Sequence, residues 1–252
     1  MDNEIVNQSK GFNVSQRYAP VSTKVILENL KMEGYEVNSF SSAKVRKITK
    51  QGFQKHLLRI SRNDLDLGID GLRPEIILIN SHDGSCGLKF LVGIYRFACA
   101  NGLVVGSSYF TRNIRHVGDV YPKVLNAIDD VKKALPLIAQ DIKRFGMRQL
   151  TQNEKETFAL KVAQASNPEN TKFLNVGTLL EVRRNEDMGS DLFTILNVVQ
   201  ENMLIGNLSI IRKVTVDNNE IEVVRKMRKV KSMSRSTEIN QAVWDIATQI
   251  AA

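Results

Sequence analysis

The apolar run Ile76-Ile77-Leu78-Ile79 is the feature that most constrains the fold of this 252-residue chain. Short runs rich in β-branched residues are typical of strands buried in a sheet. This run ends abruptly at four hydrogen-bonding side chains, those of Asn80, Ser81, His82 and Asp83. The sequence therefore predicts an interior strand that stops at a polar turn, which is where chemistry or recognition is expected.

Further strand-like segments surround this run. The segment Leu88 to Cys99 fits the helical and the strand period, but its β-branched and aromatic residues favour a strand. Turn residues at Asp83-Gly84 and Asn101-Gly102 separate neighbouring segments. Because several strands follow one another directly, antiparallel pairing is expected. The other predicted strands are Tyr35 to Val45, Lys55 to Ile60, Ile76 to Asn80, Leu103 to Val105 and Tyr109 to Val117.

Helical periodicity dominates before and after these strands. A short helix is predicted over Val21 to Lys31, with Ser22 or Thr23 as its candidate cap, and a longer one over Val120 to Phe145. Pro136 should kink or divide the longer helix, because its ring removes one backbone hydrogen bond. The remaining predicted elements are a helix from the capping box Thr151-Gln152-Asn153-Glu154 to Ala165, a helix from Ser190-Asp191 to Gly206, a hairpin of Ser209 to Val216 with Ile221 to Arg228, and a helix over Ser236 to Ile250 that carries Trp244.

Together these elements predict an α+β fold, with an N-terminal helix, a mainly antiparallel sheet, and then a helical layer with a C-terminal hairpin and helix. Residues 1–12 are polar and predict a flexible tail. The loop around Asn167-Pro168 separates a core domain over residues 13–165 from a C-terminal region over residues 166–252, which is expected to pack on that core.

Composition and net charge restrict the classes of protein to which this chain can belong. The chain has 35 Lys and Arg against 27 Asp and Glu, a net charge of +8 that favours a polyanionic partner. Cys86 and Cys99 are its two cysteines, which excludes a disulfide framework and a Cys-x-x-Cys zinc motif. No apolar stretch is long enough for a membrane span, and the N-terminus has no secretory pattern, so a cytoplasmic protein is expected.

Several segments resemble a known family. They are Gly52 to Arg59, Asn80 to Ser85, Ile94 to Gly106, Asp191 to Asn202 and Ser234 to Trp244. They are similar to phage- and plasmid-like proteins grouped as domain of unknown function nine-three-two, which are widespread in prophages and mobile elements. The resemblance implies residence in a bacterial host and supplies no catalytic residues.

The polar cluster after the apolar run has two interpretations. As a catalytic group it would use Asn80, Ser81, His82, Asp83 and Arg96, with His82 as general base and Asp83 orienting it or binding a divalent metal. As a turn, the same short polar side chains would bond to their own backbone. His56 and His116 could join His82 around a metal, but their spacing forms no ligand motif. We therefore expect no cofactor unless the protein is an enzyme.

Basic residues suggest a second kind of site. Arg96, Arg112 and Arg115 could extend a basic strip on the sheet. The aromatic rings that could stack on bases are those of Phe53, Phe90, Tyr95, Phe97, Tyr109 and Phe110, and of these Phe53, Tyr109 and Phe110 are expected to be exposed. For the basic residues from Arg225 onward, the alternative is a solvated edge strand whose lysines protect it from aggregation. The residues predicted to contact phosphates are Lys44, Arg46, Lys47, Lys50, Lys55, His56, Arg59, Arg225, Lys226, Arg228 and Lys229.

Three functional hypotheses follow. The first is a nucleic-acid-binding protein of a phage or mobile element that binds or anneals single-stranded DNA in recombination and could act as a homo-oligomer. The order of helix, antiparallel strands and helix resembles single-strand annealing proteins of phage recombination systems. The second is a metal-dependent nuclease or nucleotide hydrolase built on Asn80 to Asp83. The third is an adaptor that binds a host protein and counters host defence.

Overall fold

The computed structural model describes residues 5, 11, 14–19, 21–97, 102–104, 111–166, 171, 173–206, 208–216 and 219–252. The chain forms two compact units, Met1–Ile138 and Ala139–Ala252. The two units share one long helix, α3 (Tyr121–Met147), within which the boundary falls.

An antiparallel sheet forms the centre of the N-terminal unit. Its strands follow the order β1-β2-β3-β4-β5, and β6 also pairs with β4. All described pairs are antiparallel, as the sequence predicts. The segment from Leu88, whose apolar pattern fits both the helical and the strand period, forms a strand, as predicted. The strands are β1 (Glu36–Ser42), β2 (His56–Ser61), β3 (Leu72–Asn80), β4 (Leu88–Arg96), β5 (Gly102–Val104) and β6 (Thr111–Ile114), and a short 3-10 helix, η1 (Ile48–Lys50), lies between β1 and β2.

The two faces of this sheet carry different side chains. On one face, Leu78 of β3 lies opposite Phe90 of β4, and both are fully buried. On the other face, Ile77 lies opposite Leu91 within a small apolar cluster. Because successive side chains of a strand point to opposite faces, a continuous apolar run such as that of β3 can be buried on both faces.

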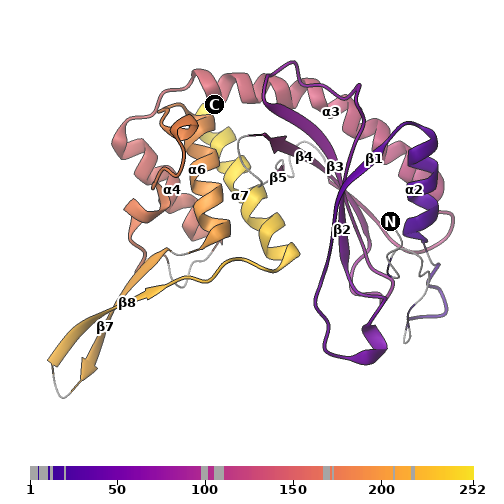
Figure 1. The fold of residues 1–252 in the computed structure, drawn as a ribbon, viewed down its shortest axis with the longest axis horizontal. Helices are drawn as coiled ribbons and strands as arrows, with labels where there is room; N and C mark the ends of the chain where they lie inside the picture. Colours follow the sequence, from indigo (N-terminus) through magenta and orange to yellow (C-terminus); the bar gives the residue numbers. More distant parts are fainter. Residues whose placement is uncertain are drawn as a thin grey trace. The chain divides into compact units, whose positions relative to one another are not determined.

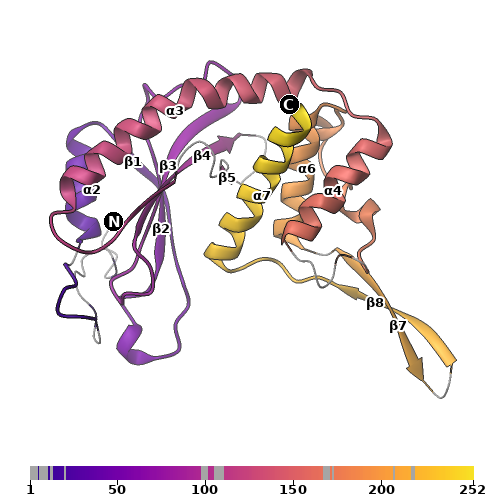
Figure 2. The same ribbon diagram turned by 180° about the vertical axis from the view of Figure 1, so that it is seen from behind.

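Two helices lie on the first face, as Figures 1 and 2 show. Ser22 is the N-cap of the helix α2 (Thr23–Met32), and its hydroxyl accepts a hydrogen bond from the Val25 backbone N–H. The first half of α3 runs beside α2, and residues of both helices line an apolar groove. Pro136 does not divide α3. Its ring lies on the exposed side of the helix, where water can satisfy the carbonyl that loses its N–H partner.

The C-terminal unit is mainly helical. Trp244 is fully buried and meets the Phe145 ring edge-on at 5.3 Å. The predicted capping box is confirmed, because the Thr151 N–H donates to Glu154 Oε2 at 2.8 Å and the Glu154 N–H donates to the Thr151 hydroxyl. Asp191 likewise caps the next helix through the Thr194 N–H. The elements are α4 (Gln152–Ser166), α6 (Leu192–Ile205), α7 (Met233–Ala251), the short helices η2 (Val176–Leu179) and η3 (Asn185–Asp187), and a hairpin of β7 (Ser209–Val216) and β8 (Asn219–Lys226).

The predicted α+β class and the order of its elements are confirmed. Of the predicted tail over residues 1–12, Ile5 and Gly11 are described, and both are buried. The Gly11 N–H donates to the His82 carbonyl. Asn167-Pro168, Asn101 and Cys99 lie outside the described residues. Within the described ranges, no helix is long and apolar enough to cross a membrane.

Candidate functional sites

A buried polar cluster lies at the end of the sheet where β3 stops. It contains His56 from β2 and His82 from the segment after β3, both without exposed surface, with ring centres 5.2 Å apart. Thr23 of α2 reaches the same place, and its hydroxyl lies 2.8 Å from His56 Nε2 and 3.4 Å from His82 Nε2. Asn80 Nδ2 donates to that hydroxyl at 2.9 Å and also to the Val21 carbonyl. Thr23 therefore links α2 to the end of the sheet by hydrogen bonds.

The partners of these groups fix where the protons lie. His56 Nδ1 is 3.1 Å from the Gln54 carbonyl, which only accepts, so Nδ1 carries the proton. The Nε2 of neutral His56 is then an acceptor for the Thr23 hydroxyl. Since that hydroxyl has one proton, a neutral His82 can bond to it only as an Nε2 donor. The hydrogen bonds of the cluster are complementary when both imidazoles are neutral.

Burial keeps these imidazoles neutral. It is the main cause that lowers the pKa of His82 to about 4, and the charges of His56 and His116 lower it further. Burial also lowers the pKa of His56 and of His116. His116 is 6% exposed, and its ring stacks on Tyr18 at 4.9 Å. His56 and His82 lie side by side and His116 is near enough for its charge to act on His82, although the spacing of the three histidines in the sequence forms no ligand motif.

The segment after β3 is a turn built from its own side chains. The Ser81 hydroxyl accepts from the Cys86 N–H and donates to the Cys86 carbonyl, both at 3.0 Å. Asp83 Oδ1 accepts from the Ser85 N–H, and Asp83 Oδ2 accepts from Lys50 Nζ at 3.2 Å. Although burial opposes it, these hydrogen bonds from Ser85 and Lys50 lower the pKa of Asp83.

The residues of the hypothetical catalytic group do not converge. His82 bonds to Thr23 in the interior, whereas Asp83 bonds to Lys50 near the surface. Arg96 lies opposite Leu72 at the far end of the sheet from Asn80. In the part of the chain that the structure describes, no group of three or more His, Cys, Asp or Glu side chains could hold a metal ion. The geometry here is that of a structural turn beside a buried polar cluster.

The opposite end of the sheet carries a charged cluster on the other face. Glu75 of β3 is 1% exposed, and its carboxylate accepts three hydrogen bonds. The donors are Arg59 Nε at 2.5 Å, Arg73 Nη2 at 3.1 Å and Asn38 Nδ2 at 2.9 Å. Two guanidinium groups share one carboxylate, so the cluster keeps a net positive charge. Arg59 Nη2 and Arg73 Nε are buried atoms without a hydrogen-bond partner among the described residues.

Two aromatic rings lie against these arginines. The guanidinium carbon of Arg59 lies 4.5 Å from the centre of the Tyr95 ring, and that of Arg73 lies 5.1 Å from it. Arg73 also lies 5.8 Å from the ring centre of Phe97, which meets Tyr95 edge-on. Phe97 is 60% exposed. We define Arg59, Arg73, Glu75, Tyr95 and Phe97 as the arginine–aromatic cluster.

The aromatic residues named as possible stacking platforms differ in their exposure. Phe90 is a core residue without exposed surface, whereas Phe97 is exposed. Phe53 is half-buried, and Tyr109 and Phe110 lie outside the described residues. Arg73 and Glu75 were missed by sequence reasoning. Their signal was an alternating pair of charges directly before the apolar run of β3.

The predicted phosphate-contacting residues of the N-terminal unit fall into four places. Lys44, Arg46, Lys47 and Lys50 are exposed on the loop between β1 and β2, which we call the basic loop. His56 is fully buried and so takes no part in an exposed strip. Arg59 belongs to the arginine–aromatic cluster, and Lys55 is half-buried at the start of β2.

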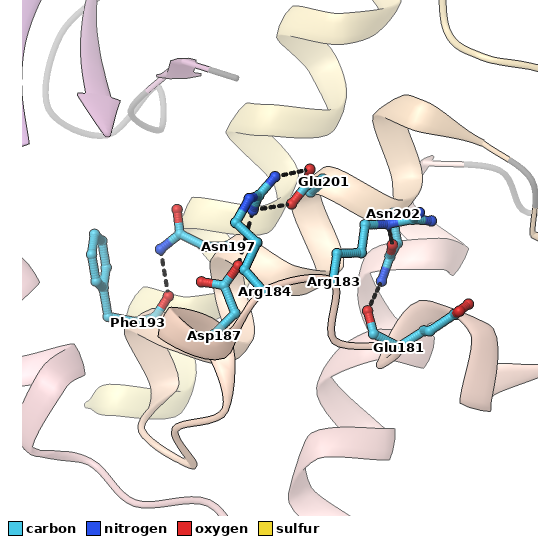
Figure 3. A network of polar contacts seen from close by, with 8 residues as sticks. All are labelled: Glu181, Arg183, Arg184, Asp187, Phe193, Asn197, Glu201 and Asn202. Carbon is cyan, nitrogen blue, oxygen red and sulfur yellow. Dashed lines mark hydrogen bonds and ion pairs between the residues drawn. The ribbon is translucent and has the colours of Figure 1, made fainter. Parts of the chain in front are cut away.

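The C-terminal unit contains a second buried polar network, which Figure 3 shows in detail. Arg184 donates from both terminal nitrogens to the Glu201 carboxylate, one of them at 2.6 Å, and also to Asp187 at 3.0 Å. Arg183 Nε donates to Asn202 Oδ1 at 2.7 Å. These bonds fasten the segment before α6 to a buried face of that helix, and they leave Arg183 itself exposed.

This network escaped sequence reasoning because its members look unremarkable one by one. Asn202 is fully buried, and its amide nitrogen donates to the carbonyls of Leu179 and Glu181 at 2.9 Å each. Asn197 donates to the Phe193 carbonyl at 2.7 Å. Each buried polar group of α6 named here is satisfied, which is typical of a network that fixes structure.

The second predicted basic set lies on and after β8. Arg225, Lys226, Arg228 and Lys229 are all exposed. Lys226 Nζ donates to the Ser209 hydroxyl of β7 at 2.9 Å. The hairpin that carries them projects from the helices of its own unit (Figure 1).

Comparison with known proteins adds a family likeness. The sequence model described as Domain of unknown function (DUF932) matches residues 13–244. UPF0380 protein YafZ and UPF0380 protein YfjQ of Escherichia coli (strain K12) are each 29% identical to the chain over 245 residues. Each comparison covers 96% of this chain and 86% of the relative. No solved structure matches.

Proposed function

The chain belongs to the family described as Domain of unknown function (DUF932), and from its own geometry we propose that it binds single-stranded DNA at the arginine–aromatic cluster. The observation that carries the proposal is the exposed Phe97 ring beside two guanidinium groups that share a single carboxylate. Single strands are bound by aromatic rings on which bases stack, combined with basic groups that follow the phosphates.

The contacts within the cluster suit this role. Glu75 holds Arg59 and Arg73 in fixed positions, so little side-chain entropy is lost when a phosphate arrives. The Arg73 side chain is 37% exposed, so part of it can be reached by a phosphate of a bound strand. Stacking of one base on Phe97 would contribute about 1–3 kcal/mol.

Charge supports the same proposal. The chain has a net charge of +8, and exposed cations of the basic loop belong to the same unit as the cluster. Lys44, Arg46 and Lys47 would add phosphate contacts beyond those of the cluster. We place this activity in strand binding or annealing during recombination of a phage or another mobile element, in the cytoplasm of a bacterial host.

A salt-titrated binding measurement tests the proposal. Fluorescence anisotropy of a labelled single strand of about 30 nucleotides should show saturable binding at about 50 mM salt, and weaker binding to a duplex of the same sequence. With about four phosphate contacts, affinity should fall roughly 50-fold between about 50 and about 200 mM salt. Lack of binding at the lower salt concentration would overturn the proposal.

A further inference from the structure

The hairpin of β7 and β8 is a two-stranded sheet with an exposed apolar residue on each face. Ile221 is 45% exposed and Val224 is 59% exposed, and these residues point to opposite faces of β8. An isolated two-stranded hairpin is marginally stable in water, and sheets of three or more strands are the stable ones. The hairpin therefore has the features of a sheet that another strand completes.

The free edge belongs to β8. The outer edge of β7 is occupied near its start, because the Ile211 N–H donates to the Phe173 carbonyl and the Asn175 N–H donates to the Ser209 carbonyl. From Ile221 to Lys226, no described strand pairs with the outer edge of β8. An unpaired strand edge is a template for pairing with another chain.

The charges of β8 are complementary to those of a second β8. Within β8, the glutamate Glu222 comes before Val224 and the lysine Lys226 comes after it. In an antiparallel pair related by a two-fold axis at Val224, Glu222 of each copy lies opposite Lys226 of the other. Glu222, Val224 and Lys226 are on one face of the strand, because alternate residues of a strand point to the same face. Directly opposite unlike charges stabilise a strand pair, whereas like charges destabilise it.

We propose that β8 pairs with β8 of a second copy of this chain, in this antiparallel register, to form a continuous four-stranded sheet. Val224 then lies against Val224 of the second copy, and the exposed apolar surface at the axis is covered. The interface is isologous, which closes at two copies. This proposal is independent of DNA binding at the arginine–aromatic cluster.

Charge reversal tests the register. Lys226→Glu places a glutamate opposite Glu222 of the other copy, and Glu222→Lys places a lysine opposite Lys226. Sedimentation equilibrium should give a dimer for the unaltered protein and at least about a tenfold weaker self-association for each variant alone. In an equimolar mixture of the two variants every such pair is again of opposite sign, so heterodimers should form. Recovery in the mixture also shows that both variants are folded.

A cysteine on the axis gives a second, independent readout. The Cα atoms of directly opposite residues in an antiparallel pair are about 4.5–5.5 Å apart, within the range of a disulfide. Val224→Cys should therefore form an intermolecular disulfide on mild oxidation. The unaltered protein and Met32→Cys, at a residue that is 79% exposed on α2, are the controls. A monomeric unaltered protein, or a Val224→Cys variant that links no faster than the control, would overturn the proposal.

Discussion

The guanidinium carbon of Arg59 lies over the Tyr95 ring, 4.5 Å from its centre, while Arg59 Nε donates to the buried Glu75 carboxylate. A cation over an aromatic face is worth about 0.5–2 kcal/mol, more when it is desolvated. The contact fixes both side chains on one face of the sheet. The exposed Phe97 directly follows the end of β4, which carries Tyr95. The predictions about DNA binding depend on this arrangement.

Removal of the exposed ring should weaken single-strand binding. Phe97→Ala is expected to lose about 1–3 kcal/mol of binding free energy, because one base loses its stacking partner. Phe97→Trp should retain affinity, since the indole also stacks. Leu125→Ala, at a residue that is 49% exposed on α3, is the matched control and should bind normally in the anisotropy assay. Equal affinities for Phe97→Ala and the control would argue against stacking.

Arg73 should contribute a phosphate contact that salt screens. For Arg73→Gln, the slope of log affinity against log salt should become shallower by about 0.7, which is the value for one single-strand phosphate contact. Lys24→Gln removes an exposed charge from α2, on the other face of the sheet, and should leave the slope unchanged. An unchanged slope for Arg73→Gln would remove this residue from the interface.

The Thr23 hydroxyl should be important for stability rather than for binding. Thr23→Val leaves His56, His82 and Asn80 without their shared partner, which costs about 1–3 kcal/mol of the free energy of unfolding. Thr23→Ser keeps the hydroxyl and should be much closer to the unaltered protein. Urea denaturation compares the three proteins, and equal midpoints for the valine and serine variants would contradict the hydrogen-bond assignment.

Acid should destabilise the N-terminal unit through the same cluster. The pKa of His82 is about 4 in the folded protein, against 6.5 for an ordinary histidine. The unfolded chain therefore binds a proton first, so the free energy of unfolding falls as the pH drops from about 6.5 to about 4. His82 alone accounts for about 3 kcal/mol of this fall. His56 and His116 act in the same direction.

Replacement of His82 checks the sign of this effect. The free energy of unfolding of His82→Asn, measured by urea denaturation across this pH range, should depend less steeply on pH than that of the unaltered protein. The slope is the decisive quantity, because the substitution also changes stability at neutral pH. Parallel profiles for the two proteins would show that His82 is not the titrating group.

The sequence predicted the elements of the fold better than the sites. Period and capping residues located β3, the helix that begins at Gln152 and the helix that Asp191 caps, because these signals are local. Thr23 was recognised only as a candidate cap for α2. Its bonds to two histidines depend on how α2 packs against the sheet, which no local pattern encodes.

The arginine–aromatic cluster shows the same limit. Arg59 was identified by its charge and Tyr95 by its ring, but their contact requires the register of β2, β3 and β4. Phe97 was not preferred over Phe53, since exposure at a strand end is a tertiary property. Pro136 was expected to kink or divide the long helix, and α3 continues through it undivided, because an exposed position tolerates the lost backbone bond.

Photo-crosslinking tests the central claim most directly. A single strand of about 30 nucleotides that carries 5-iododeoxyuridine would be irradiated in complex with the protein, and the linked peptides identified by mass spectrometry. We predict covalent linkage at Phe97 or Tyr95, the aromatic rings of the cluster. Linkage confined to other parts of the chain, with neither ring modified, would contradict DNA binding at this face of the sheet.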